Sequence, residues 1–312
     1  METPQVIPMN KELPDVSIIL LTFNGEPYLD EVLTSVFDQK MHFNFEVIVI
    51  DSGSRDRSLE IIRKYPVRIH QIEKQEFGHG KTRNLGVKLA SGQFMVFLTQ
   101  DATPAHRNWL ENLVNPLLKD RSVAGAYSRQ LARPDCNPCE RRDIESGAPP
   151  VSMVKKVNFK EDLQKESYEK HYQLFMMFSN ISSCIRRDVL QQIPLNENIT
   201  MMEDQEWCKR VIEAGYTVIY EASSLVYHSH NYPLKMIYRR HFDYGKSYIK
   251  FATFKLSFMN ILFFTVFESL VDFFFIIGQP NNFFWKLKWM AKSPLIRFAM
   301  KYGFHKGLIT RQ

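Results

Sequence analysis

Several acidic side chains in this sequence stand directly after apolar segments, where they could bind a nucleotide, a metal ion or a proton. Asp51 ends the run VIVID, and Asp101 follows FMVFLTQ. A carboxylate at the carboxyl end of a strand can accept hydrogen bonds from a ribose or a base, or it can cap the next helix. Asp101 could also bind a divalent cation such as Mg²⁺, which prefers carboxylate oxygens. One carboxylate makes a weak site, so a second ligand should come from elsewhere.

Two further groups could complete such a site. Glu203 and Asp204 begin a helical stretch, where the helix dipole stabilises acids. Asp204 also suits a general base, since an Asp with the reference pKa of about 3.9 is ionised at neutral pH. His228 and His230 end a β-rich segment. Strand alternation predicts that only one of the two faces the site, where a neutral imidazole could bind a metal ion.

The segment QEFGHGKTRNLG, residues 75–86, ends like a phosphate-binding P-loop. That motif requires glycine five positions before its Gly-Lys-Thr, and Gln75 stands there instead. The dinucleotide pattern G-x-G-x-x-G fails at Arg83. His79, Lys81 and Arg83 still cluster at a predicted helix N-terminus, where phosphate binds favourably. A plain glycine turn before a helix is the structural alternative.

Short apolar runs alternate with amphipathic stretches of helical length in the first 100 residues. This alternation predicts a largely parallel sheet with helices on its faces, and ligands bind outside the carboxyl ends of such strands. Ser54 is a candidate N-cap for the second helix. The Pro- and Cys-containing segment 129–150 is expected to be a long loop. The expected strands are 16–21, 45–50, 67–72, 94–98, 180–185 and 217–227, and the expected helices are 28–39, 56–64, 81–90 and 203–215.

Four segments, taken in order, resemble the inverting glycosyltransferases of family 2. They are VSIILLTFNGEPYLDEVLTSVFDQ, FEVIVIDSGSRDRS, GKTRNLGVKLASGQFMVFLTQDA and MMEDQEWCKRVIEAGY. The resemblance implies the GT-A fold: an α/β protein with a mixed, mostly parallel sheet flanked by helices. We expect an N-terminal arm at 1–13, the GT-A domain at 14–235, and a helical amphipathic extension at 236–312.

The same resemblance implies roles for individual residues. Asp204 would be the catalytic base, and Asp101 would bind Mg²⁺ or Mn²⁺ with His228, or with His230 in its place. The family's metal motif commonly has two acids, whereas here it reads Thr99-Gln100-Asp101. Residues expected to contact the donor are Thr22, Asn24, Asp51, Arg83, Asn84, Gln100 and Asp101. Trp207 and residues 180–183 would border the sugar or acceptor pocket.

A finer similarity is to bacterial rhamnosyltransferases. It is carried by FGHGKTRNLG, FLTQDA, SRQLARPD and HSHNYPLKMIYRRHFDYG. It implies dTDP-L-rhamnose as donor and a glycan or lipid-linked acceptor of a cell-surface polysaccharide. A UDP-sugar donor is the alternative.

The C-terminal region differs in character from the rest of the chain. Residues 256–278 are long and apolar enough for a membrane span, but Asn260, Glu268 and Asp272 form one polar stripe on a helical wheel. Residues 281–312 contain seven Lys or Arg and no Asp or Glu, with Trp and Phe between them. We expect a helix or helical pair that lies on a membrane surface, with a dimerisation helix as the alternative. The enzyme would then be cytoplasmic and peripheral on the inner membrane, and the pattern does not favour nucleic acid.

Other functions are less compatible with the sequence. A sugar-nucleotide pyrophosphorylase would need a basic, glycine-rich loop after the first strand, and TFNGEPYL lacks it. A non-catalytic sugar-nucleotide or glycan-binding protein would not need both Asp101 and Asp204. Cys136 and Cys139 have half of a zinc spacing, but closed zinc sites take four ligands, so free thiols are expected.

Overall fold

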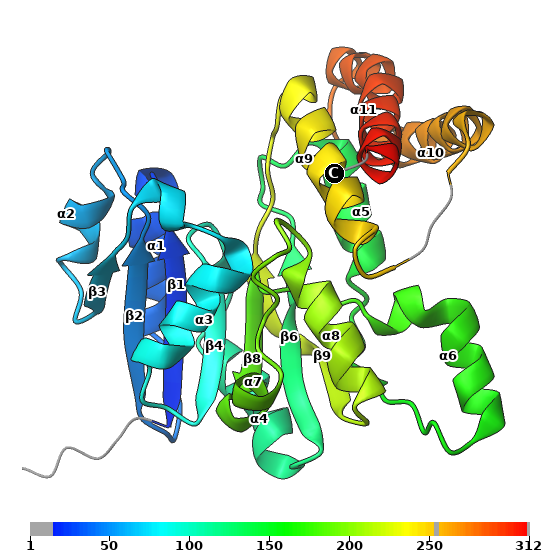
Figure 1. Cartoon of the computed structure of the whole chain (residues 1–312). Helices are drawn as coiled ribbons and strands as arrows, with labels where there is room; N and C mark the ends of the chain where they lie inside the picture. Colours follow the sequence, from blue (N-terminus) through cyan, green and yellow to red (C-terminus); the bar gives the residue numbers. More distant parts are fainter. Residues whose placement is uncertain (1–14, 253–255, 311–312) are drawn as a thin grey trace, which may run out of the picture.

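A mixed nine-stranded sheet forms the centre of the molecule (Figure 1). The computed structural model describes residues 15–252 and 256–310, so the arm expected at 1–13 lies outside the described residues. The strands are β1 Val16–Thr22, β2 Phe45–Asp51, β3 Arg68–Gln71, β4 Phe94–Thr99, β5 Thr103–Pro104, β6 Val123–Leu131, β7 Met153–Lys155, β8 Ser182–Arg186 and β9 Thr217–Tyr227.

The strand order places several chain ends along one edge of the sheet. Strands follow the order β3-β2-β1-β4-β8-β6-β9-β5, and β7 also pairs with β9. β3, β2, β1 and β4 are parallel, β8 is antiparallel to both β4 and β6, and β6 and β9 are parallel. The carboxyl ends of β1, β2, β4, β6 and β9 therefore meet the beginning of β8 at one edge, where ligands bind in such sheets.

Helices cover both faces of this sheet. The helices up to residue 213 are α1 Glu26–Phe37, α2 Ser58–Ile62, α3 His79–Leu89, α4 Trp109–Lys119, α5 Pro138–Gly147, α6 Asp162–Phe175, α7 Arg187–Gln192 and α8 Glu203–Glu213, of which α5 packs mainly against the C-terminal helices instead of the sheet. One apolar core joins the sheet to α1, α2 and α4, and a second joins the opposite face to α3, α7 and α8. In β1 the alternate residues Ile18 and Ile19 enter different cores, because successive side chains of a strand point to opposite faces.

Two local predictions were wrong. Ser54 does not cap α2, which begins at Ser58 after Arg57; the Ser54 hydroxyl instead accepts a hydrogen bond from the Asn24 amide. The segment 129–150 is not one long loop, because it contains the end of β6 and helix α5. Asn137 caps α5 by accepting a hydrogen bond from Glu140 N, and proline at the start of a helix is well tolerated.

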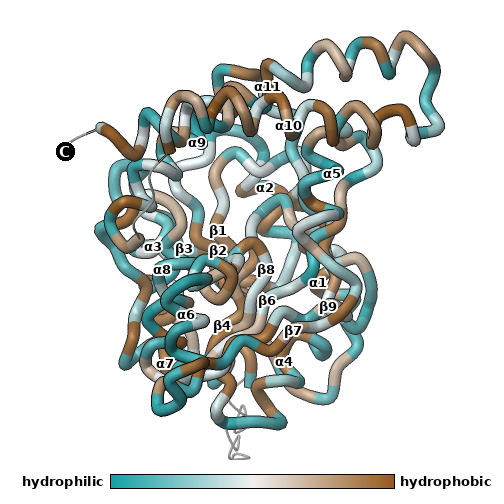
Figure 2. The backbone as a smooth tube through the Cα atoms, turned by 90° about the vertical axis from the view of Figure 1, so that its right-hand side faces the viewer, coloured by the Kyte–Doolittle hydropathy of each residue, from teal (hydrophilic) through white to brown (hydrophobic). Residues whose placement is uncertain are grey.

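Three more helices form one end of the molecule (Figures 1 and 2). They are α9 Leu234–Tyr248, α10 Phe258–Ile277 and α11 Phe283–Ile309. Figure 2 shows apolar residues concentrated along α10. Among the described residues, α10 is the one helix long and apolar enough to cross a membrane, by length and composition.

Candidate active site

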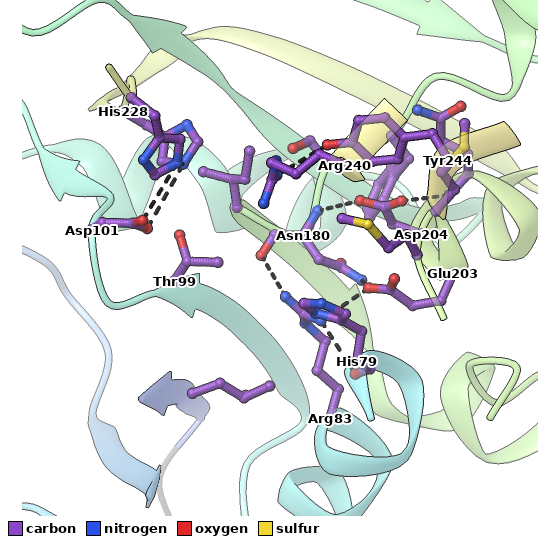
Figure 3. A pocket seen from close by; sticks show the side chains of 18 of the residues that line it. His79, Arg83, Thr99, Asp101, Asn180, Glu203, Asp204, His228, Arg240 and Tyr244 are labelled. Carbon is purple, nitrogen blue, oxygen red and sulfur yellow. Dashed lines mark hydrogen bonds and ion pairs between the residues drawn. The ribbon is translucent and has the colours of Figure 1, made fainter. Parts of the chain in front are cut away.

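A cavity of about 660 Å³ opens at the carboxyl edge of the sheet. The ends of β1 and β4, the segment before β8, the start of α8 and the residues after β9 line it, and α3 and α9 contribute further side chains. Thr22, Arg83, Gln100, Asp101, Asn180, Glu203, Asp204, His228, His230 and Arg240 are among the lining residues. In the view of Figure 3, Asp101 and Asp204 lie on opposite sides of this cavity.

Asp101, His228 and His230 converge on one point. His228 Nε2 lies 3.7 Å and His230 Nε2 3.5 Å from Asp101 carboxylate oxygens, and the two Nε2 atoms are 3.1 Å apart. These three possible ligand atoms all lie within 4.8 Å of one another. The expectation that only one histidine faces the site was wrong. β9 ends at Tyr227, so strand alternation does not govern residues 228–230.

The protonation states of this group suit a divalent cation. Burial lowers the pKa of His228 to about 4, and burial also lowers the pKa of His230, so both imidazoles are neutral at pH 7. Burial alone would raise the pKa of Asp101, but His228, His230 and hydrogen bonds from Thr99 and the Asp101 backbone together lower that pKa below its usual value. His228 Nδ1 lies 3.1 Å from Gln130 Oε1, which can hold the ring with Nε2 toward Asp101. One carboxylate and two neutral imidazoles fit Mn²⁺ or another divalent metal ion.

Asp204 is held in the first turn of α8 by two backbone amides. Its Oδ2 accepts a hydrogen bond of 3.0 Å from Asn180 N, and its Oδ1 one of 2.8 Å from Gln205 N. Met202 just before the helix has φ of 65°, a left-handed conformation that non-glycine residues rarely adopt and that often occurs at functional sites. Burial, followed by the charge of Glu203, raises the pKa of Asp204 to about 7. The assumption of an ordinary Asp pKa was therefore wrong.

Arg83 forms a buried ion pair. Its Nη1 donates to Glu203 Oε1 at 2.9 Å, and its Nη2 to the carbonyl of Asn180 at 3.4 Å. The guanidinium thus fixes the two residues beside Asp204, and removing one partner of such a pair costs about 3–5 kcal/mol. Arg83 Nε is buried and has no hydrogen-bond partner within the described part of the chain. The contact of Arg83 with a diphosphate stays a prediction.

Of the other residues expected to contact the donor, some line the cavity and others support the chain around it. Gln100 Oε1 accepts hydrogen bonds from the Thr22 hydroxyl and from Phe23 N, which ties the ends of β4 and β1 together beside the cavity. Asn24, Asp51 and Asn84 are not among the lining residues. Asn24 Oδ1 accepts from Arg55 N.

Asp51 and Asn84 are both buried but have different surroundings. Asp51 Oδ2 accepts hydrogen bonds from Gly53 N and Ser54 N, whereas its Oδ1 has no partner among the described residues. Asn84 donates to the Leu195 carbonyl and to Glu197, so its amide holds the chain before α8 rather than facing the cavity.

The expected border of the sugar pocket is partly different. Asn180 and Ile181 line the cavity. Trp207 does not: it is fully buried in the core, and its indole N–H donates to the Ile193 carbonyl. Its position on the inner face of α8 explains this, because it points toward the sheet.

Sequence reasoning missed the contribution of α9. Arg240, His241 and Tyr244 line the cavity from this helix. The Arg240 guanidinium lies 4.9 Å from the Tyr232 ring centre and donates to Tyr244 Oη at 3.1 Å. It forms no ion pair with a carboxylate in the described part of the chain. The i,i+4 spacing of Arg240 and Tyr244 was the available signal, since such pairs share one helix face.

Cys136 and Cys139 are buried and form no disulfide. Burial raises the pKa of Cys136 to about 11 and that of Cys139 to about 12, so both are protonated. Within residues 15–252 and 256–310, the one group of three or more possible metal ligands is Asp101, His228 and His230.

Comparisons with known proteins identify the family of this chain and agree with its fold. Residues 17–193 match the family described as Glycosyl transferase family 2. The chain is 33% identical over 233 residues to the O-antigen chain rhamnosyltransferase RfbN of Salmonella typhimurium, covering 74% of this chain and 71% of the relative. It is 32% identical to the O-antigen chain rhamnosyltransferase WbaN of Salmonella anatum, covering 75% and 72%.

Solved structures share the fold. The mannosyltransferase PcManGT from Pyrobaculum calidifontis, in complex with GDP-Man and Mn²⁺, superposes with a TM-score of 0.57 at 16% identity, over 96% of this chain and 89% of that one. TarS from S. aureus in complex with UDP-GlcNAc gives 0.53 at 17% identity, over 89% and 71%. The fold is the expected GT-A fold. Since the family match spans more than half of the chain, this protein belongs to glycosyl transferase family 2 and is a glycosyltransferase.

Proposed function

We propose that this enzyme transfers L-rhamnose from dTDP-L-rhamnose, with inversion, to a glycan or lipid-linked acceptor in cell-surface polysaccharide synthesis. One observation carries the chemistry: a cluster of metal ligands at Asp101 and a half-buried carboxylate, Asp204, face the same cavity. The rhamnose donor is supported by the relatives named O-antigen chain rhamnosyltransferases. A lipid-linked acceptor would place the enzyme on the cytoplasmic face of the membrane.

The reaction is a single displacement at the anomeric carbon. The acceptor oxygen forms the new bond, the bond to the diphosphate oxygen breaks with its electron pair, and Asp204 takes the acceptor proton. The amides of Asn180 and Gln205 hold the Asp204 carboxylate in place. A divalent cation bound by Asp101, His228 and His230 would stabilise negative charge on the leaving diphosphate.

The nucleoside of the donor would lie at the ends of β1 and β2. Asp51 supports this placement, because its Oδ1 is buried without a partner in residues 15–252 and 256–310, while Oδ2 accepts hydrogen bonds from two amides. Buried polar atoms are normally hydrogen-bonded, so an unpaired acceptor suits a ribose hydroxyl or a base N–H. Thr22, Asn24 and Gln100 shape the adjoining backbone.

Arg240 is our candidate for a cation that binds the diphosphate, since Arg83 is already paired with Glu203. Because hydrogen bonds to charged groups contribute about 1.5–3 kcal/mol, we expect Arg240→Gln to weaken dTDP binding at least about ten-fold and dTMP binding less. Isothermal calorimetry with Mn²⁺ measures both. Arg239→Gln is the matched control, because Arg239 is the exposed neighbour on α9. Equal dTDP affinity in the Arg240 variant and the wild type would refute the assignment.

A thermal-shift panel of nucleoside-diphosphate sugars with Mg²⁺ or Mn²⁺ tests the donor. We expect dTDP-L-rhamnose to raise the unfolding temperature most, since a ligand that binds only the folded state stabilises it. Ligand-free protein with each metal ion is the control. A shift produced only by a uridine donor would overturn the rhamnose assignment and favour the UDP-sugar alternative.

A further inference from the structure

The outward face of α10 is apolar over its whole length. Exposed side chains on this helix include Met259 at 72%, Phe263 at 64%, Val266 at 61% and Phe274 at 71%. The first residues of α11 extend the surface, with Phe284 at 80% exposure. Monomeric soluble proteins rarely expose an apolar patch of this kind without a partner. We call the exposed apolar side chains of residues 258–277 and 283–287 the apolar face.

Ion pairs hold the opposite face of α10 against the rest of the protein. Asp272 is fully buried and accepts hydrogen bonds of 2.7 Å from both Arg297 Nε and Nη2, while Arg142 Nε lies 3.1 Å away. Arg297 also binds Asp143 of α5. Pulling α10 away to span a bilayer would separate Asp272 from Arg297 and Arg142 and place its charge in a low-dielectric medium, which is very costly. Of the polar stripe expected from sequence, Glu268 and Asp272 therefore anchor α10 against α5 and α11, whereas Asn260 is exposed in the capping box at the start of the helix.

Cationic and indole side chains lie next to the apolar face. Lys288 and Lys292 are exposed on α11, and both ammonium groups lie over the Trp289 ring, at 5.6 and 5.2 Å. No Asp or Glu occurs between residues 281 and 312. Trp at a membrane interface and Lys beside an apolar helix face are typical of surface-bound helices.

We infer that the apolar face docks on an anionic lipid bilayer, with α10 lying in the plane of the interface and not crossing it. Charge complementarity selects this occupant: lysines beside an apolar surface attract anionic headgroups. A second copy of the chain is disfavoured, since a two-fold contact uses the same patch on both copies, and residues 281–310 offer these lysines no carboxylate. Docking itself does not depend on the donor; only its use for a lipid-linked acceptor rests on the proposed function.

The docking helices are rigidly joined to the cavity. α11 packs directly against α9, where glycines allow backbone contact: a Cβ on Gly245 would collide with the Phe304 carbonyl, and one on Gly303 with the Tyr238 carbonyl. α9 also carries Arg240 and Tyr244, which line the cavity. Membrane docking would therefore hold the cavity at a constant orientation to the lipid surface.

Co-sedimentation of the full chain with vesicles tests the inference. We expect binding to phosphatidylglycerol-containing vesicles at least ten-fold stronger than to phosphatidylcholine vesicles, and weaker in high salt. Phe263→Ser combined with Phe274→Ser should reduce binding at least ten-fold on anionic vesicles. Leu163→Ser is the matched control, because Leu163 is 82% exposed on α6, away from the apolar face. Lys288→Gln with Lys292→Gln should remove the preference for anionic lipid.

Three results would overturn the inference. The first is unchanged vesicle binding in the Phe variant, and the second is resistance of the membrane-bound protein to alkaline carbonate extraction. The third is a wild type that binds no vesicles but forms a dimer in ultracentrifugation, with the dimer abolished in the Phe variant. The thermal shift with dTDP is measured on the same variants. Retained nucleotide binding with lost vesicle binding supports docking, whereas a wild type that binds vesicles but no nucleotide refutes only the proposed function.

Discussion

Replacing Asp204 with Asn is expected to lower kcat by about two to four orders of magnitude, the range by which general-base catalysis contributes. The amide keeps the size of the carboxylate but cannot accept the acceptor's proton. Affinity for dTDP should stay close to wild type, because Asp204 lies across the cavity from Asp101 in Figure 3. Single-turnover transfer and calorimetry separate the two effects.

The pH dependence of wild-type activity is a second test of Asp204 as the base, and its direction can be predicted. Burial raises the pKa of Asp204 to about 7, and a base works only when ionised, so kcat/KM should increase as pH rises through about 7. Asp188→Asn is a matched control, since Asp188 is an exposed acid in the first turn of α7. Near wild-type turnover in the Asp204 variant would remove this residue from the role of base.

Replacing Asp101 with Asn, or His230 with Ala, is expected to abolish the metal-dependent part of dTDP binding. The structure brings Asp101, His228 and His230 to one point, and losing one of three ligands should weaken the metal site at least about ten-fold. Calorimetry with dTDP in Mn²⁺ and in EDTA measures the difference directly.

His42→Ala is the control for this series, since the His42 side chain is 93% exposed. If the wild type bound dTDP equally in Mn²⁺ and in EDTA, the metal role of the cluster would be excluded. The two variants together distinguish the two roles. The Asp204 variant is expected to keep metal-dependent nucleotide binding and lose sugar transfer, whereas the Asp101 variant is expected to lose both.

The first half of the fold could be predicted from the sequence because its signals are local. The apolar runs at 45–50 and 94–98 are buried strands, and the helix beginning at Glu203 is present. Parallel strands buried on both faces need nearly continuous apolar runs, which are easy to recognise. The position of Asp101 at the end of such a run followed from the same logic.

Long-range contacts decided where prediction failed. Arg83 stands near a helix N-terminus, where a phosphate binds favourably. It nevertheless forms an ion pair with Glu203, which lies 120 positions later in the chain. The two histidines both reach Asp101 because the chain leaves the strand at Tyr227. Neither fact has a local signature, because each depends on which segments meet at the edge of the sheet.

By itself the sequence determined the family and the strands β1 to β4, β8 and β9, since those depend on residue type and local periodicity. It missed β6, although β6 lies between β8 and β9 in the sheet. Only the tertiary structure decided the pKa of Asp204, because that pKa depends on burial and on the neighbouring Glu203. It also decided that Arg240, and not Arg83, is the cavity arginine without a carboxylate partner in the described chain. Charge in a protein depends on distance and desolvation, and only the folded chain sets those.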